Sequence, residues 1–427
     1  MTLDCGEGGV ELNGTTPVSF FIVLPPVQFE GGFTITVTDT WGGSKEYSTT
    51  KKNPVGRSNG LRMPAKEYVG EKPVEIKDPQ DLATQEPANC YIVSQSGSYS
   101  FPSVKGNGNE SVGSVASAEV LWETFGTDQT PNKGDLIAAV KYENGRILFA
   151  TPATFQKGNA VIAAKDASGT ILWSWHIWFT DEPEEQVYYN NAGTMMDRNL
   201  GATSATPGDV CARGLLYQWG RKDPFLGALS LSAYVSSTIT WPSPVESDFS
   251  NGTIEYATAH PTTFITYNSD NSDWYYTCSS STDNTRWATS ETSKSIYDPC
   301  PTGWRVPDGG SNGVWSTALG SSSSFRDSSL SYDTHDDLNF SGKFGSASTI
   351  LYPAPGVRSP NNGIPLNVGK VGFYWSASPG GENNYNVYFL SINPFPLVDP
   401  SNDTIRASGF SVRCVKEGSQ SSGDQPL

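Results

Sequence analysis

Apolar and polar residues alternate along the first part of the chain. Phe33, Ile35 and Val37 are separated by single threonines, which is the pattern of a strand with one buried and one exposed face. An earlier apolar run, residues 18–24, ends at two prolines, which lack the amide donor that a sheet ladder needs. We expect about three or four strands in residues 1–67, too few for a closed β-sandwich. A sheet edge is therefore expected to pair with a strand of another segment or chain.

Residues 88–183 contain two pairs of apolar segments that are joined by short polar turns. The pairs are 137–142 with 146–149, and 161–164 with 171–179. In the first turn, Asn144-Gly145 favours the positive φ angles of a tight hairpin. Short strands with such turns between them predict a β-sandwich module. The preceding residues 68–87 are polar, charged and proline-containing, which predicts a linker.

Long loops rich in Ser, Thr, Asn and Asp dominate residues 184–417. Two short helices are expected there, at residues 214–220 and 313–319. A domain with so little regular structure needs cross-links or aromatic packing. Six tryptophans can supply that packing, namely Trp219, Trp274, Trp287, Trp304, Trp315 and Trp375. Residues 418–427 are polar and are expected to be disordered. The chain as a whole is predicted to be mainly β and multidomain.

The composition fits this organisation and argues against several classes of function. The 427 residues include 43 glycines and 29 prolines, which suits many short strands joined by turns. The net charge of −16 and the lack of a basic run argue against nucleic acid as a partner. Since no run of about 18 apolar residues exists, no transmembrane segment is predicted. The first residues do not form a secretory signal, so either the protein is cytoplasmic or an export signal lies upstream.

Six scattered cysteines help to choose between these compartments. They form no Cys-x-x-Cys pair and are accompanied by three histidines, so a zinc site is not expected. Disulfides formed in an oxidising compartment suit these cysteines, which favours export. Six buried thiols in a cytoplasmic protein are the alternative. No cofactor is predicted.

Two stretches of the chain resemble modules of bacterial surface proteins. Residues 20–26 and 32–39 resemble the end of the fimbrillin-like β-sandwich domains of pili and surface lipoproteins in anaerobic bacteria. Residues 88–107 are similar to a module that recurs in multidomain surface proteins of the same bacteria. The first resemblance implies that residues 1–67 are the last part of a fimbrillin-type sandwich.

The most specific resemblance lies in the C-terminal half. Five motifs occur in the order seen in Fib_succ_major domains, at residues 196–202, 216–221, 298–307, 374–378 and 409–415. Those secreted domains are similar to the C-type-lectin-like fold and to the formylglycine-generating-enzyme fold. The resemblance implies that residues 184–417 form an α+β, C-type-lectin-like domain rich in loops.

The same resemblance leads to a disulfide. Cys300 and Cys414 lie in two of the five motifs, and we expect a disulfide between them. Cys211 with Cys278 is a weaker second pairing, since these are the other cysteines of this domain. Enzymes of the related fold use reactive cysteines, whose thiolates must be accessible. Cys300 between two prolines and Cys414 in a terminal strand suit cross-link positions instead.

No other catalytic arrangement stands out in the sequence. His176, His260 and His335 have no Gly-x-Ser-x-Gly motif to accompany them, and His176 is expected to be a strand-face residue. The acidic residues 333–337 offer carboxylates for a hard cation but lack the spacing of an EF-hand loop. We therefore predict no metal site, and we predict that the protein is not an enzyme.

A recognition surface is the remaining expectation. Pro379-Gly380-Gly381 should end a strand, which predicts an exposed loop within residues 375–386. Its residue types suit a sugar or a peptide edge, although it lacks the Glu-Pro-Asn and Trp-Asn-Asp triplets of calcium-dependent lectins. An ordinary polar loop with Trp375 in the core is the alternative. The candidate ligand-binding residues are Asp308, Trp375, Glu382, Asn383, Asn384 and Tyr385.

Together these expectations predict an extracellular adhesion protein at the cell surface or in a fimbrium. It would be a tip or accessory subunit of a fimbrillin-type pilus, joined to other subunits or to a surface anchor by strand pairing. Its ligand would be a glycan or a protein on host or neighbouring cells. The alternative is a surface glycan-processing enzyme or its carbohydrate-binding accessory module, for which the sequence identifies no catalytic carboxylate pair.

Overall fold

The computed structural model describes residues 75–427 except 269–271, 277–282, 291–292, 328–329, 331–336, 381–385, 394–396 and 420–427. It also describes shorter stretches of the first 74 residues, chiefly 28–38, 44–49 and 52–56. The chain divides into two compact units, Met1–Val74 and Glu75–Leu427. Strands predominate in the described residues, which contain two short α-helices, so the mainly β fold class is confirmed. None of these helices has the length and apolar character needed to cross a membrane.

The described strands of the first unit form two small antiparallel sheets. β1 (Gln28–Phe29) pairs with β4 (Asn53–Pro54), and β2 (Phe33–Thr38) pairs with β3 (Ser44–Thr49). Phe33, Ile35 and Val37 are half-buried, whereas the threonines between them are exposed. The alternation expected for this strand is therefore confirmed.

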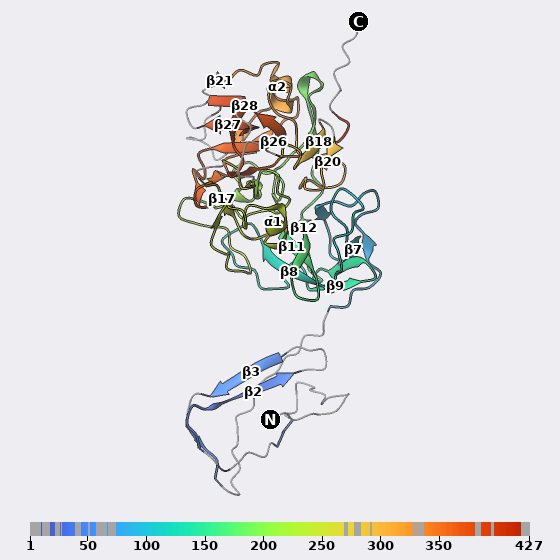
Figure 1. Ribbon diagram of the computed structural model, residues 1–427, viewed down its shortest axis with the longest axis vertical. Helices are drawn as coiled ribbons and strands as arrows, with labels where there is room; N and C mark the ends of the chain where they lie inside the picture. Colours follow the sequence, from blue (N-terminus) through green and yellow to red (C-terminus); the bar gives the residue numbers. More distant parts are fainter. Residues whose placement is uncertain are drawn as a thin grey trace. The chain divides into compact units, whose positions relative to one another are not determined.

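The second unit begins with two four-stranded sheets (Figure 1). One sheet has the order β5-β7-β10-β9, and the other has the order β6-β12-β11-β8. Their bounds are β5 (Gln80–Asp81), β6 (Cys90–Val93), β7 (Ser98–Pro102), β8 (Ser117–Thr124), β9 (Ala139–Glu143), β10 (Arg146–Ala150), β11 (Gly158–Lys165) and β12 (Ile171–Phe179). Both expected hairpins form, and Asn144 (φ 50°) and Gly145 (φ 77°) make the first turn. β5 lies inside the expected linker and pairs with β7.

The sheet that contains β12 is buried on both faces. Trp173, Trp175 and Ile177 belong to the apolar core that the two sheets share. On the opposite face, Trp178 belongs to a second core together with tryptophans such as Trp219 from the C-terminal half. The boundary expected between residues 183 and 184 therefore falls inside one compact unit, because a sheet with two apolar faces needs a covering layer on each.

The C-terminal half contains one eight-stranded and one four-stranded sheet. The eight-stranded sheet has the order β21-β28-β27-β26-β29-β24-β25, with β15 also paired to β29, and β26, β27 and β28 lie side by side (Figure 1). Its strands are β15 (Leu216–Gln218), β21 (Phe325–Arg326), β24 (Val357–Arg358), β25 (Pro365–Leu366), β26 (Gly372–Gly380), β27 (Asn386–Asn393), β28 (Leu397–Ile405) and β29 (Gly409–Ser411). The four-stranded sheet has the order β13-β14-β30-β20, from β13 (Glu185–Tyr188), β14 (Gly193–Met196), β30 (Val415–Lys416) and β20 (Trp304–Arg305).

Short elements complete this half. Three strand pairs are β16 (Val245–Glu246) with β17 (Ile265–Thr266), β18 (Ala288–Ser290) with β19 (Ser293–Lys294), and β22 (Asp337–Asn339) with β23 (Leu351–Pro353). The helices are α1 (Ile254–Ala259), α2 (Val314–Leu319) and the 3-10 turns Tyr189–Asn191 and Val210–Ala212.

One of the two expected helices is confirmed and one is wrong. α2 begins after Gly313 and ends at Gly320, whose φ of 67° suits a glycine C-cap. Residues 214–220 instead contain β15, which is fully buried and antiparallel to β29. Gly214 (φ 71°) and Gly220 (φ 82°) turn the chain on each side of this strand, so pairing with a distant strand outweighs local helix propensity.

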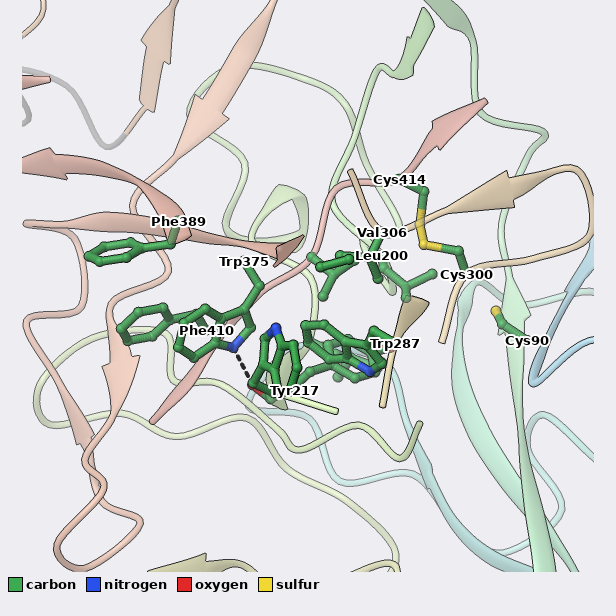
Figure 2. Close-up of a cluster of buried hydrophobic side chains, with 14 of the residues drawn as sticks. Cys90, Leu200, Tyr217, Trp287, Cys300, Val306, Trp375, Phe389, Phe410 and Cys414 are labelled. Atoms are coloured by element: carbon green, nitrogen blue, oxygen red, sulfur yellow. Dashed lines mark hydrogen bonds between the residues drawn. A yellow bond between two sulfur atoms is a disulfide. The ribbon is translucent and has the colours of Figure 1, made fainter. Parts of the chain in front are cut away.

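The cysteines give one confirmed and one wrong pairing. Cys300 and Cys414 form a disulfide with a Cα–Cα distance of 6.1 Å, so the expected cross-link is confirmed. Cys211 carries a free thiol, so the weaker pairing with Cys278 is wrong; Cys278 itself lies outside the described residues. The disulfide belongs to the second core, which also contains Trp178 and Trp219, and so does the free thiol of Cys90 on β6 (Figure 2).

Candidate functional site

The end of the β26–β27 hairpin lies where the sequence predicts a recognition loop. β26 continues to Gly380, with Pro379 opposite Val387 and Gly380 opposite Asn386. The strand thus ends within the Pro379-Gly380-Gly381 segment that was expected to end it, although Pro379 itself is still paired. β26 pairs with β29 only at Tyr374, so at Pro379 the strand has β27 as its neighbour on one side and no paired strand on the other. A proline is tolerated there because the missing N–H can face the unpaired edge. The connection 381–385 lies outside the described residues.

The loop that contains Asp308 packs onto β26 close to this hairpin end. Ala377 N donates to Pro307 O at 2.8 Å, and Gly309 N donates to Ser378 Oγ at 2.9 Å. A Cβ atom on Gly309 would lie 2.2 Å from Ser376 Oγ, so only glycine permits this approach. Two segments that are distant in sequence are thus brought together.

Asp308 has a fixed orientation because it pairs with a buried guanidinium. Arg305 Nη2 lies 2.6 Å from Asp308 Oδ2, and Arg305 Nη1 donates to Oδ1 at 3.1 Å. The Arg305 side chain is 4% exposed and that of Asp308 is 21% exposed. The Asp308 carboxylate is therefore held in place by the buried Arg305 side chain while it remains partly exposed to solvent. The positive charge of Arg305 partly balances its negative charge.

The other side of the hairpin end also presents polar groups. Asn386 Nδ2 donates to Asp403 Oδ2 at 3.2 Å, and Tyr388 lies opposite Asp403 in the strand register. We define the hairpin-end surface as Asp308, Ser378, Asn386, Tyr388 and Asp403, all of which are partly exposed. Its two carboxylates can accept hydrogen bonds from a polar ligand, and its amide, its serine hydroxyl and its phenol can both donate and accept them.

Trp375 does not belong to this surface. Its side chain is completely buried, its indole N–H donates to Tyr217 O at 2.8 Å, and its ring stacks on Phe410 at 4.2 Å (Figure 2). The assignment of Trp375 to a ligand-facing position is therefore wrong, because the alternation of β26 directs this side chain into the core.

The remaining candidates, Glu382, Asn383, Asn384 and Tyr385, lie in the connection of the hairpin and outside the described residues. Their role stays a prediction. The flanking residues Gly380 and Asn386 are paired with each other, so this connection starts and ends at the hairpin-end surface.

Sequence reasoning missed a buried array of a thiol, an imidazole and an amide. Cys90 Sγ lies 3.3 Å from His176 Nδ1, and His176 Nε2 lies 2.9 Å from Asn159 Oδ1. Cysteine hydrolases use the same order of groups, but all three side chains here are buried. Burial raises the pKa of Cys90 and lowers the pKa of His176 to about 3, so both groups stay neutral near pH 7. No local motif could have revealed the array, since strand pairing brings its members together.

A second buried polar group lies where the two halves of the second unit meet. Asp298 accepts hydrogen bonds from Cys300 N at 2.8 Å and Val306 N at 2.9 Å. Burial raises the pKa of its carboxyl to about 6, and the Lys294 ammonium, 4.0 Å away, opposes this shift. The group stabilises the turn that carries the disulfide and has no contact with the hairpin-end surface among the interactions described.

No described group of three or more His, Cys, Asp or Glu side chains is arranged to bind a metal ion. Comparison with family models, curated proteins and solved structures gives no match to this chain.

Proposed function

We propose that the protein is a cell-surface adhesion protein that binds a glycan or a protein of host or neighbouring cells through the hairpin-end surface. The observation that carries this proposal is the attachment of the Asp308 loop to β26. It places a rigidly oriented carboxylate beside a hairpin end that also presents an amide and a phenol.

The chemistry of the surface favours a ligand with several hydroxyl or amide groups. Carboxylates accept hydrogen bonds, the Asn386 amide both donates and accepts, and the Tyr388 ring offers an apolar face. Such a mixture matches the polar edges and apolar faces of a sugar. The connection 381–385 would add a carboxylate, two amides and a second phenol, because it contains Glu382, Asn383, Asn384 and Tyr385.

The N-terminal unit supplies the argument for assembly. β2 and β3 form a two-stranded sheet among the described residues, and Phe33, Ile35 and Val37 on one face are only half-buried. A sheet of this size gains stability from additional strands. On this proposal a pilus subunit or a surface anchor provides them, and the protein is a tip or accessory subunit of a fimbrillin-type pilus.

The experiment is a glycan array probed with the intact protein and with variants. Glu382→Ala, Asn383→Ala and Tyr385→Ala are combined in one protein, and Asp308→Asn is prepared separately. The matched control combines Glu246→Ala, Asn361→Ala and Tyr234→Ala, which are exposed residues of the same types elsewhere in the second unit. We expect the control to bind like the intact protein and the hairpin variants to lose binding.

Two results would contradict the proposal. Full binding by a correctly folded hairpin triple variant would place the binding surface elsewhere. Hydrolysis or transfer products from the same glycans, measured in parallel, would favour the rival function of a glycan-processing enzyme.

A further inference from the structure

After the two-residue strand β5, the second strand of the second unit is paired in parallel. Cys90–Val93 in β6 pair in register with His176–Phe179 in β12. Two backbone hydrogen bonds extend this ladder at its ends, from His176 N to Asn89 O at 2.8 Å and from Thr180 N to Val93 O at 3.0 Å. By contrast, β12 pairs with β11 in an antiparallel hairpin.

The parallel direction decides how this pair responds to tension. The upstream chain reaches β6 at its N-terminal end, and β12 continues into the C-terminal half from its own C-terminal end. In a parallel pair these two ends lie at opposite ends of the ladder. A pull between them runs along the strands and loads all ladder hydrogen bonds together, whereas a pull across adjacent ends breaks such bonds one at a time.

A buried amide secures the entry end of the ladder. Asn89 Nδ2 donates to Ile296 O and Asp298 O, both at 2.8 Å, and Asn89 Oδ1 accepts from Trp173 Nε1 at 3.1 Å. Asn89 is 1% exposed, and a Cβ on Gly106 would lie 2.1 Å from its Oδ1, so the packing at this point is close. Buried hydrogen bonds of this kind are costly to break.

Further contacts connect both ends of the ladder to the C-terminal half. At the exit end, Arg198 Nη1 donates to Thr180 Oγ1 at 3.1 Å and Nη2 donates to Asp181 Oδ2 at 3.0 Å. At the entry end, Asp298 lies two residues before Cys300, which is bonded to Cys414 near the last strand. The entry strand is thus hydrogen-bonded to a segment that a disulfide connects to the end of the fold.

We propose that Asn89, β6 and β12 form a force-bearing clamp that keeps residues 89–427 folded when the upstream chain is under tension. This inference concerns mechanical resistance and needs no ligand for its measurement. Its failure is therefore distinguishable from a failure of the proposed adhesive function.

Single-molecule force spectroscopy on the full chain tests the clamp. With handles at the two termini, Asn89→Ala should unfold the second unit about tenfold faster at a given load, because buried side-chain bonds on the loaded path are lost. The matched control is Glu123→Gln, which alters a buried carboxylate that binds Gly134 N, Leu136 N and Ile137 N away from that path. Thermal stability is measured for both variants.

A second pulling geometry separates a clamp from general destabilisation. With one handle at Ser168, in the exposed turn between β11 and β12, and the other at the C-terminus, β6 is not loaded. Asn89→Ala should then unfold at the wild-type force. Equal weakening in both geometries, or an unchanged force in the first, would overturn the proposal.

A milder variant covers the case in which Asn89→Ala does not fold. Asn107 Nδ2 donates to Ser295 O at 2.8 Å and Asp298 O at 3.0 Å, and its φ of 58° suits glycine. Asn107→Gly therefore removes two bonds at the entry end without backbone strain. It should lower the unfolding force in the first geometry only, and a wild-type force there would count against the clamp.

Discussion

Replacing Asp298 with asparagine removes a buried carboxylate from the place where the two halves of the second unit meet. Asp298 is 1% exposed and accepts hydrogen bonds from Cys300 N and Val306 N. In acid the protonated carboxyl still has acceptor capacity on both oxygens, whereas the amide NH2 group of asparagine only donates, so one of these two N–H groups loses its acceptor. We expect Asp298→Asn to be less stable than the wild type in acid, by about 1–3 kcal/mol.

The pH dependence of this difference is the sharper prediction. Burial raises the pKa of Asp298 from 3.8 to about 6, so the proton is bound more tightly in the folded state. The stability that Asp298 gains from this raised pKa is fully present below its unfolded pKa. It is lost as the pH rises through about 6. A shift of this size corresponds to about 3 kcal/mol at most between pH 3 and pH 7. The penalty of Asp298→Asn should therefore shrink as the pH rises.

Denaturant unfolding of both proteins at pH 4, 5, 6 and 7 measures this effect. Subtracting the two free energies of unfolding removes the contributions of all other titrating groups that the substitution leaves unchanged. A difference that stays constant from pH 4 to pH 7 would show that the Asp298 pKa is not raised.

Three further outcomes are expected. Non-reducing peptide mapping should recover Cys300 and Cys414 in one cross-linked peptide, and two free thiols would contradict the disulfide. Cys414→Ser should lower the free energy of unfolding by up to about 4–5 kcal/mol, because the disulfide closes a loop of 114 residues. Trp375→Ala should cost about 3–5 kcal/mol in chemical denaturation, because the ring is completely buried, and a loss below about 1 kcal/mol would refute its place in the core. Alkylation of the native protein should modify the half-buried Cys211 before the buried Cys90, as followed by mass spectrometry, and the reverse order would contradict the described packing.

Local patterns in the sequence determined the strands and turns that depend on neighbouring residues. The alternation at Phe33, Ile35 and Val37 predicts a half-buried strand, and the structure has one. Asn144-Gly145 predicts a tight hairpin because asparagine and glycine accept positive φ angles at low cost, and both residues adopt them. The disulfide between Cys300 and Cys414 was expected from the family resemblance of the two motifs that contain these cysteines, and the structure has it.

For the candidate site, the sequence assigned Asp308 and the region around β26 to one surface without showing how the two segments meet. Their contact depends on Gly309, which admits Ser376 and Tyr388 at distances that a side chain would forbid. The sequence left open whether Trp375 faces a ligand or the core, and the structure buries it together with its strand neighbours Tyr374 and Ser376. The two faces of this part of β26 contribute to two different cores, since Trp375 and Tyr374 belong to separate clusters.

Only the tertiary structure decided which faces cover one another. β12 carries tryptophans on both of its faces. Its own sequence does not show that Trp178 packs with Trp219, whereas Trp175 packs between the two sheets of the sandwich. The same pairing of distant strands creates the contact between Cys90 and His176. Side-chain alternation is a local property of the backbone, whereas the layer that covers each face is chosen by the free energy gained when distant apolar surfaces leave water together.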